Sequence, residues 1–474
     1  MIAKKGVVYL VGAGPGSPDL ITLRGLRAIY KSDVIICDKL IPDDFFENLG
    51  LSIKGKEIIK LDSALKIKRI QTVENIILQS IKIGKVVTRL KIGDPMIFGR
   101  HSEELEFLLK HNIQFEIIPG LSSVTSSPCL ANVPLTWRNS GRSFSAVTAR
   151  CEQGKINEIY PETDTLIILM GINVFPDIIK RLINNGWSKS TPFLIIEKSS
   201  MLWERRIEGK LGEVINFREK YTVSPPAIIV IGEGARKKIN YLRRPVILFT
   251  GFEPEPFRPF GEVLHWNALE IEPNEFGIRR LDGCFKEIKE GYFDKILFTS
   301  GIAVRLFFRR LREKDLDSRI FARSRIIACG EFVRTYFYEN GILVDYYFDT
   351  HNLTKVFKDR VFKEGKILVL TGNREVKNLR NLKITTIPLY YTKKNKELGK
   401  YPLPEYDIIC FTNSDAVKFF FETYGEKAFF RQIWCSTINA WKEVKKLGFK
   451  AELINMYSDD IEESYNLGGM FNLS

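Results

Sequence analysis

Residues 7–25 read VVYLVGAGPGSPDLITLRG, and this stretch decides the fold class of the first part of the chain. An apolar strand runs into a glycine–proline turn and then into a helix start, which is typical of an α/β unit. Such a turn brings backbone N–H groups close to a ligand. The dinucleotide fingerprint requires G-x-G-x-x-G, whereas Gly12, Gly14 and Gly16 are spaced G-x-G-x-G, with Ser17 in place of the third glycine. The loop is therefore predicted to bind a ligand other than a dinucleotide.

The composition is that of an ordinary globular protein. The chain has 474 residues, 45% hydrophobic and 27% charged, and at roughly 100–200 residues per domain two to four domains are expected. The net charge is +14, from 71 basic and 57 acidic residues, without an arm of consecutive basic residues. This pattern argues against a nucleic-acid partner. The diffuse positive charge is typical of a protein that binds a polyanionic small substrate. A proteome that is generally rich in lysine explains it equally well.

The cysteines and histidines predict neither disulfides nor a metal site. None of the seven cysteines forms a C-x-x-C pair, and most lie in apolar runs, so they are predicted to be reduced core residues of a cytoplasmic protein. With only four histidines, no metal site is expected. The N-terminus enters a strand without a signal-peptide pattern, and no apolar run approaches the ~18 residues of a membrane span. Neither membrane insertion nor secretion is expected.

Strand-like and helical patterns alternate along the whole chain, which predicts an α/β protein. The strand AIIVIGEG is followed by the basic stretch ARKKINYLRRP, and a new strand begins at Val246. The region 233–246 therefore has the composition of a domain linker. It predicts a first domain at 1–240 and a second at 241–474.

The second domain contains an internal repeat. DKILFTSGIAVRLFF (294–308) is similar to YDIICFTNSDAVKFFF (406–421), and the segment 325–347 is similar to 432–454. Two copies of one βαβ unit predict two similar lobes, each with a small parallel sheet. The extended run KITTIPLYYTKK (383–394) lies between the copies and is predicted to cross from one lobe to the other.

Several polar residues of the first domain follow apolar strands, where α/β sheets bind ligands. Asp38 follows VIIC, and Asp94 lies in a Gly-Asp-Pro turn. Without further context, a helix N-cap or turn aspartate is the favoured interpretation of Asp38, and a plain β-turn is the favoured interpretation of Asp94. Ser122 and Ser123 either bind a ligand or cap a helix, and capping is favoured without context. Met170 ends a strand, where a lone methionine is usually a core residue.

Taken in order, the motifs of the first domain resemble those of the uroporphyrinogen-III C-methyltransferases, of the tetrapyrrole methylase family. The motifs are VGAGPGSPDLITLRG, VIICDKLI, RLKIGDPMIFGR, IIPGLSSV, VPLTWR, TLIILMG and PPAIIVIG, and they cover about residues 5–240. The resemblance implies a two-lobed α/β fold that holds S-adenosyl-L-methionine in the cleft between the lobes. It also implies a homodimer formed through the methylase half.

The resemblance assigns roles residue by residue. Asp38 matches the proposed proton acceptor, and Lys60 falls at the proposed proton donor, although its Val-Gly-Lys context reads Ile58-Ile59-Lys60 here. Arg89, Arg100 and Arg138 either pair with substrate carboxylates or are solvated or structural arginines. The implied cofactor-binding residues are Pro15, Ile92, Gly93, Asp94, Ile97, Ser122, Ser123, Met170, Ser199 and Ala227.

This sequence departs from the family pattern at several of these positions. Ile92 replaces a glycine and is expected to add bulk beside the cofactor. Ser199 also stands where the family usually has glycine. Trp137 replaces a histidine, and Ala149-Arg150 replace a Gly-His pair after the expected strand at 142–148. These changes leave the predicted reaction class unaltered.

The second domain resembles uroporphyrinogen-III synthase across about 245–474. The features are FTSGIAV, ACGEFV, KILVLTGNRE, IPLYYT and DIICFTNSDAV. The implied fold has two lobes joined by a two-strand ladder, lobe one at about 245–274 plus 395–474 and lobe two at about 275–390. The family's recurrent side-chain candidate matches Tyr390, whose hydroxyl could assist departure of the substrate hydroxyl. The alternative is a half-buried hinge tyrosine.

The turns of the two copies match the synthase family to different degrees. Thr299 and Ser300 match the family's Thr-Ser turn, as do Thr412 and Asn413 in the second copy. The later Ile-Gly-x-x-Thr turn has lost its threonine after Gly330, and its second copy, at 436–439, has no glycine.

Together the two resemblances predict a bifunctional enzyme. The second domain closes hydroxymethylbilane to uroporphyrinogen III, and the first methylates that product at C2 and C7 to give precorrin-2, which leads to sirohaem and cobalamin. The product of one domain is the substrate of the other. The alternative is an active methyltransferase whose second domain binds tetrapyrroles without catalysis.

Overall fold

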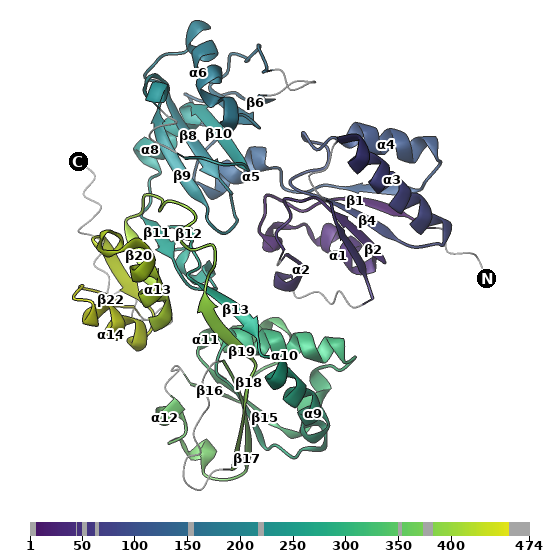
Figure 1. Ribbon diagram of the computed structural model, residues 1–474, viewed down its shortest axis with the longest axis vertical. Coiled ribbons are helices and arrows are strands. Elements are labelled where there is room, and N and C mark those ends of the chain that lie inside the picture. The colour runs from purple at the N-terminus through teal and green to yellow at the C-terminus, as the bar shows by residue number, and fades with distance from the viewer. Residues whose placement is uncertain are drawn as a thin grey trace. The chain divides into compact units, whose positions relative to one another are not determined.

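The computed structural model describes residues 6–43, 45–49, 55–61, 66–149, 156–216, 222–348, 353–372 and 383–454. Arg150 and Cys151 lie outside these ranges. The chain divides into two compact units (Figure 1). Unit 1 comprises Met1–Asn267, Gly399–Phe411 and Tyr424–Trp434, and unit 2 comprises the remaining segments Ala268–Leu398, Thr412–Thr423 and Cys435–Ser474.

The first sheet of unit 1 is fully parallel. Its strands run in the order β3-β2-β4-β1-β5. Helices α3 and α4 cover one face and share one apolar cluster with it, and helices α1 and α2 cover the other face and share a second cluster with it (Figure 1). Burial on both faces explains why strands such as VIIC are apolar throughout. The elements are β1 (Val8–Gly12), α1 (Leu23–Lys31), β2 (Val34–Cys37), α2 (Phe45–Asn48), β3 (Glu57–Lys60), α3 (Lys66–Lys82), β4 (Val87–Lys91), α4 (His101–Lys110) and β5 (Phe115–Ile118).

The second sheet of unit 1 is mixed, in the order β6-β7-β10-β8-β9. Strand β10 is antiparallel to both β7 and β8. Residues from α6 line the apolar cluster on one face, and residues from α5 and α8 line the cluster on the other. The elements are α5 (Ser123–Leu130), β6 (Phe144–Thr148), β7 (Thr165–Leu169), α6 (Phe175–Asn184), β8 (Pro192–Glu197), β9 (Arg205–Lys210), β10 (Ala227–Gly232) and α8 (Glu233–Tyr241).

Helix α8 corrects one prediction. Most of the basic stretch predicted to be a linker is this helix, whose Ala235 and Lys238 are buried. Lys238 Nζ lies 2.9 Å from the carboxylate of Glu262. A charged stretch is expected to be solvated, because a buried charge needs a partner of opposite charge. For Lys238 that partner is Glu262, which is distant in sequence.

A third sheet begins after α8. Its strands within unit 1 run in the order β12-β11-β20-β21, and β11 is parallel to both of its neighbours. The predicted new strand at Val246 is therefore confirmed. The elements are β11 (Val246–Phe249), β12 (Glu262–His265), β20 (Ile408–Phe411) and β21 (Gln432–Cys435).

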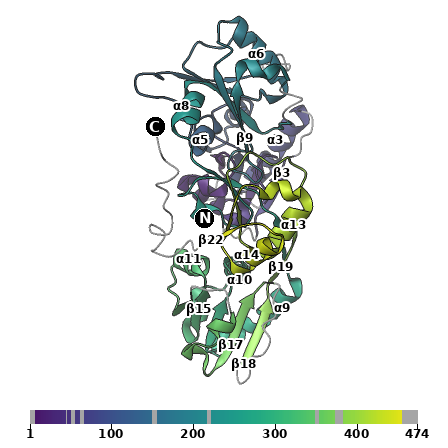
Figure 2. The same ribbon diagram turned by 90° about the vertical axis from the view of Figure 1, so that its left-hand side faces the viewer.

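Unit 2 contains the predicted two-strand ladder and a parallel sheet. In the ladder, β13 pairs antiparallel with β19, and the predicted crossing run consists of β18 followed directly by β19 (Figure 2). The sheet has the order β16-β15-β14-β17-β18, with every pair parallel. Its strands and the ladder are β13 (Leu269–Pro273), β14 (Lys295–Phe298), β15 (Arg325–Cys329), β16 (Tyr346–Phe348), β17 (Lys366–Thr371), β18 (Lys383–Pro388) and β19 (Tyr390–Lys394).

The internal repeat is confirmed element by element. The first segment of each copy is a strand, a turn and a helix, β14–α10 and β20–α13, and the second is β15–α11–β16 and β21–α14–β22. The remaining elements are α9 (Glu275–Glu290), α10 (Gly301–Glu313), α11 (Glu331–Glu339), α12 (Leu353–Val356), α13 (Ser414–Tyr424), α14 (Ile438–Lys446) and β22 (Glu452–Leu453).

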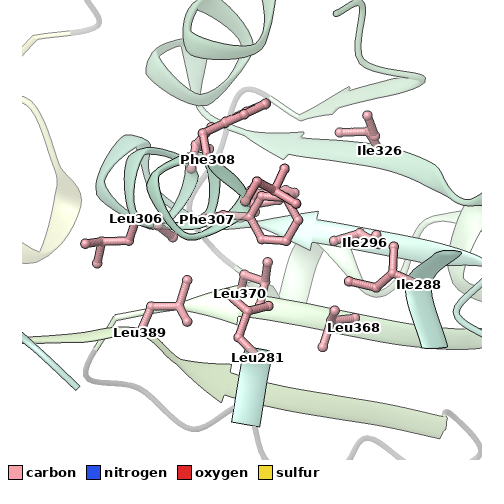
Figure 3. Packing of buried hydrophobic residues seen from close by; sticks show 14 of the residues in the cluster. Leu281, Ile288, Ile296, Leu306, Phe307, Phe308, Ile326, Leu368, Leu370 and Leu389 are labelled. Carbon is pink, nitrogen blue, oxygen red and sulfur yellow. The ribbon is translucent and has the colours of Figure 1, made fainter. Parts of the chain in front are cut away.

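Helix α10 supplies the centre of the apolar core of unit 2 (Figure 3). It starts at Ser300, whose hydroxyl accepts a hydrogen bond from Ala303 N at 3.2 Å. Phe307 is fully buried, and its ring packs edge-on against Phe298 with centroids 5.3 Å apart. Edge-to-face pairs of this kind add to the stabilisation from area burial.

The prediction for the cysteines is only partly right. Cys37, Cys329, Cys410 and Cys435 are buried, and burial raises the pKa of the Cys329 thiol to about 12. Cys129, on α5, is exposed and is therefore not a core residue. Cys284 is half-buried.

The helices are of moderate length. Helix α3 has 17 residues and α9 has 16. Across the described ranges, no helix is both long enough and apolar enough to cross a membrane.

Candidate active sites

The predicted residues of the first sheet gather at one edge. Asp38 and Ile92 directly follow β2 and β4, Lys60 is the last residue of β3, and Pro15 lies in the loop after β1. The parallel register pairs Cys37 with both Lys60 and Leu90. The loops that carry these residues therefore emerge side by side, where α/β sheets bind ligands.

The loops after β1, β4 and β5 meet in a crossing made of glycine backbone. Gly14 N donates to Gly93 O at 3.2 Å, and Gly93 N donates to Gly14 O at 2.7 Å. A Cβ at Gly12 would lie 2.6 Å from both Gly120 Cα and Gly93 O. At Gly93, with φ +73°, a Cβ would point into open space, 4.0 Å from Ser123 N. The first position therefore allows no side chain, and the second leaves an open cradle beside a backbone donor.

Asp94 holds this crossing together. Its Oδ1 accepts from Met96 N at 2.7 Å and its Oδ2 accepts from Gly120 N at 3.1 Å. Ile92, expected to crowd the cofactor, packs against the apolar cluster that contains Val11. The side chain of Ile92, which a glycine would lack, therefore packs against the core.

Asp38 belongs to a buried ion network. Arg89, only 1% exposed, donates to Asp38 Oδ1 and, through Nε, to Glu104 Oε1 at 3.0 Å. Lys91 Nζ donates to the other oxygen of Glu104 at 2.7 Å. Burial alone would lower the pKa of Arg89, but the charges of Asp38 and Glu104 raise it above its ordinary value. Burial lowers the pKa of Lys91, and Glu104 opposes that shift.

This network corrects the substrate role suggested for Arg89. Its guanidinium is buried and engaged by two carboxylates, so the structural alternative is the one observed. Glu104 was not predicted at all, because it is one of several acids at a helix start and its partners lie on β4. Ile92 N donates to Asp38 Oδ2 at 3.4 Å, so both carboxylate oxygens of Asp38 have a donor. Lys60 is paired with the exposed Asp43.

The second sheet brings three more predicted residues to one edge. Strand register pairs Ile228 with Leu169 and Ala227 with Glu197. Ala227 therefore lies next to Met170, which follows β7, and opposite Glu197, the last residue of β8 and two residues before Ser199. Met170 is 50% exposed at φ +55°, so the core alternative for it is wrong. Ser199 Oγ is buried and has no hydrogen-bond partner within the part of the chain that the structure describes.

The site edges of the two sheets touch. Ser17 N, in the loop after β1, donates to Ser200 Oγ in the loop after β8 at 3.0 Å. A Cβ at Gly16 would lie 2.5 Å from Met201 Cγ, so this glycine leaves room for the methionine. The two loops therefore form one site.

The remaining predicted residues lie on the helix starts and loops around this site. Ile97 is exposed between Met96 and Phe98, and Phe98 and Arg100 have φ +52° and +50°. Non-glycine residues in this conformation are strained and cluster at functional sites. Arg100 and Arg138 are exposed.

The serines and Trp137 show how local context settles open alternatives. Ser122 caps α5 by accepting from Val124 N at 3.3 Å, and Ser123 is the half-buried first residue of that helix. Trp137, which replaces a histidine, closes a turn with Gly141 and lies 5.3 Å under Lys237 Nζ.

A second candidate site lies at the carboxyl edge of the unit 2 sheet. Tyr390 is 8% exposed, and its hydroxyl donates to Ser300 Oγ at 2.9 Å. Thr299 Oγ1 donates to Thr371 Oγ1 at 2.9 Å. A Cβ at Gly372 would lie 2.6 Å from Tyr390 Cζ, so the ring packs directly on that glycine. Tyr390 is thus buried rather than half-buried, and it has a hydrogen-bond partner.

The turns of the two copies differ for a physical reason. Gly330 precedes α11 at φ +84° with no side-chain cap. Thr437 precedes α14 in an extended conformation, and its hydroxyl accepts from Ala440 N at 3.3 Å. The second copy therefore needs no glycine, because a threonine cap satisfies the helix start. Asn413 likewise accepts from Asp415 N at 2.7 Å.

Two α/β enzyme modules thus follow one another along the chain. Residues 7–215 match the family model for tetrapyrrole (corrin/porphyrin) methylases, and residues 259–454 match that for uroporphyrinogen-III synthase. The chain therefore belongs to both families, as a fusion of a methyltransferase and a synthase.

Two curated relatives agree with this assignment. The porphyrin biosynthesis protein HemD of Ruminiclostridium josui is 29% identical over 88% of both chains. The uroporphyrinogen-III C-methyltransferase of Priestia megaterium is 38% identical over 48% of this chain and 98% of its own. The solved structure of the Thermus thermophilus uroporphyrin-III C-methyltransferase with S-adenosyl homocysteine is 34% identical, covers 48% of this chain and 98% of its own, and has a TM-score of 0.42.

Proposed function

We propose that this protein catalyses two consecutive steps of tetrapyrrole synthesis. The second domain closes hydroxymethylbilane to uroporphyrinogen III, and the first methylates uroporphyrinogen III at C2 and C7 to give precorrin-2. The observation that carries the proposal is the convergence of Asp38, Lys60 and Ile92 on one sheet edge in a chain that contains both families.

The residues present fit S-adenosyl-L-methionine as the methyl donor. Two observations are in favour: the open cradle at Gly93, and the buried hydroxyl of Ser199, which has no hydrogen-bond partner among the described residues. We propose that the cofactor is held by Pro15, Ile92, Gly93, Asp94, Ile97, Ser122, Ser123, Met170, Ser199 and Ala227. When bound, it supplies an already activated methyl group, so the protein mainly has to position the acceptor carbon.

The chain supplies the acid–base chemistry. Asp38 accepts the proton that the methylated substrate releases, since its carboxylate is at the sheet edge and is kept charged by Arg89. Lys60 at the neighbouring strand end is the proposed proton donor. The exposed Arg100 and Arg138 are the arginines left to pair with substrate carboxylates.

In the second domain, backbone donors at the strand ends hold the carboxylates of the linear substrate. Tyr390 is the proposed catalytic residue, and Ser300 orients its hydroxyl. A domain boundary near residue 240, a homodimer formed through the methylase half and a cytoplasmic location complete the proposal.

The test supplies hydroxymethylbilane to the whole protein with and without S-adenosyl-L-methionine. Uroporphyrinogen III is expected without the methyl donor and precorrin-2 with it. Formation of only the spontaneous type I isomer would refute the synthase assignment and favour a non-catalytic tetrapyrrole-binding domain. Asp38→Ala should abolish methylation and spare ring closure, and equal loss of both would contradict separate sites.

A further inference from the structure

The loop that carries Ser199 is strained and contains no glycine. It joins β8 to β9 over residues 198–204. Lys198, Ser200 and Trp203 have φ values of +52°, +60° and +68°. Side chains rarely adopt this conformation, and it persists only where the surrounding structure over-determines it. Something outside the loop must therefore hold it.

One side of the loop faces the methyltransferase site. Ser200 Oγ accepts from Ser17 N at 3.0 Å, and Met201 fills the space beside Gly16. Ser200 N donates to Glu204 Oε2 at 2.7 Å. A shift of this loop would therefore move the glycine loop after β1.

The other side of the loop is held by residues of the synthase domain. Trp203 N donates to the carbonyl of His265 at 3.0 Å. The Trp203 indole packs edge-on against Trp266, with ring centroids 4.9 Å apart, and stacks on Tyr401 at 5.9 Å. Lys198 Nζ lies 3.5 Å from the centroid of the same Tyr401 ring. Two of the three strained residues thus meet one tyrosine.

The holding residues are themselves fixed. Trp266 is fully buried, and its Nε1 donates to Tyr424 OH at 3.1 Å. Tyr424 OH also accepts from Gly399 N at 3.0 Å, just before Tyr401. His265, Trp266, Tyr401 and Tyr424 all fall within the segment that matches the synthase family. All of the contacts lie within unit 1.

We propose that Tyr401 and Trp266, residues of the synthase domain, are positioning residues for methyl transfer, because they hold the loop 198–204 in its site-forming conformation. This inference rests on the proposed function of the methyltransferase site. It makes that site incomplete without the synthase domain, since the loop has no glycine of its own to hold the turn.

The test uses the full chain and its affinity for S-adenosylhomocysteine, measured by calorimetry. Tyr401→Ala removes the stacking and the cation–π contact, and we expect about tenfold weaker binding and a similarly raised KM for S-adenosyl-L-methionine. Tyr401→Phe keeps both contacts and should restore wild-type affinity. The synthase rate should stay within twofold in both variants.

Tyr292 provides a matched control. Its ring lies 3.5 Å from Lys366 Nζ and packs edge-on against Phe293 at 5.1 Å, so Tyr292→Ala removes the same kinds of contact in unit 2. It should leave the affinity for S-adenosylhomocysteine unchanged.

The possible failures can be told apart. If the wild type does not bind S-adenosylhomocysteine, the proposed function of the first domain fails. If the wild type binds it and Tyr401→Ala binds within twofold as well, or if Tyr401→Phe is as weak as Tyr401→Ala, the positioning role is refuted. If Tyr401→Ala loses both activities through misfolding, Lys198→Met decides. It removes only the cation–π contact, so unchanged affinity would overturn the inference and weaker affinity with normal ring closure would support it.

Discussion

We expect the ion pair between Arg89 and Asp38 to set the pH range of methyl transfer, because Asp38 is the proposed proton acceptor. The variant Arg89→Met keeps an unbranched side chain that fills much of the buried stem's space and removes the charge. The guanidinium is 1% exposed and donates to Asp38, which is largely buried itself. A hydrogen bond to a charged group is worth about 1.5–3 kcal/mol. Its loss destabilises the charged form of Asp38 by that amount.

This loss has a definite sign. The charged carboxylate is the form that accepts a proton, so the acid limb of methylation activity should move to higher pH. At about 1.36 kcal/mol per pH unit, the expected displacement is about one to two pH units. Lys91 continues to neutralise Glu104, so Asp38 is the carboxylate that loses the guanidinium while it keeps the hydrogen bond from Ile92 N.

The assay is the pH dependence of kcat/KM for methylation of uroporphyrinogen III, with ring closure measured on the same protein as a control for folding. Arg89→Lys keeps the charge but loses the forked geometry, and it should shift the limb less than Arg89→Met. An acid limb that stays in place in Arg89→Met, with methylation still present, would show that Asp38 is not the proton acceptor or that Arg89 does not act on it.

Three further results are expected from other parts of the molecule. Glu262→Gln removes one of the two carboxylates that pair with each of the buried cations Arg206 and Lys238, so the free energy of unfolding should fall by up to about 3–5 kcal/mol, the cost of a broken buried ion pair, whereas the exposed Glu405→Gln should leave it unchanged. Gly372→Ala places a methyl group 2.6 Å from Tyr390 Cζ, so it should reduce the rate of ring closure at least tenfold while the rate of methylation is retained. An equal relative change in both rates would contradict the proposed synthase site at Tyr390. Burial lowers the pKa of His265 from 6.5 to about 4, so between these pH values the unfolded chain binds a proton that the folded state excludes. The free energy of unfolding should therefore fall as the pH drops from about 6.5 to about 4. In urea denaturation, His265→Gln should flatten that part of the pH profile.

The sequence was most informative where structure is local. Strand ends and glycine turns are encoded by consecutive residues, so the α/β class, the position of Asp38 at a strand end and the extended run at 383–394 could be predicted from them. The two-strand ladder, which pairs β13 with β19, was implied only by the family resemblance. The internal repeat at 294–308 and 406–421 was equally visible, because each copy folds as one strand–turn–helix unit.

What could not be predicted depends on partners that are distant in sequence. The sequence left three interpretations of Arg89 open: a substrate-binding, a solvated or a structural arginine. Only the fold shows that it pairs with both Asp38 and Glu104. The burial of Tyr390 depends on the absence of a side chain at Gly372. The replacement of the family's glycine by Ser199 did not reveal the strain of the loop 198–204, because the contacts that hold the loop come from Trp266 and Tyr401, which are distant in sequence.

The junction between the two family segments shows the same dependence in its charges. Its stretch ARKKINYLRRP has the composition of a solvated linker, yet Lys238 is buried because Glu262 lies beside it. Glu262 also accepts from Asn132 Nδ2 at 3.0 Å and is paired with the buried Arg206. A buried carboxylate with three donors costs little only while all of its partners are present. Separating the two segments within this stretch would remove Glu262 from the buried Arg206 and Lys238, so we expect each part to be less stable alone than in the whole chain.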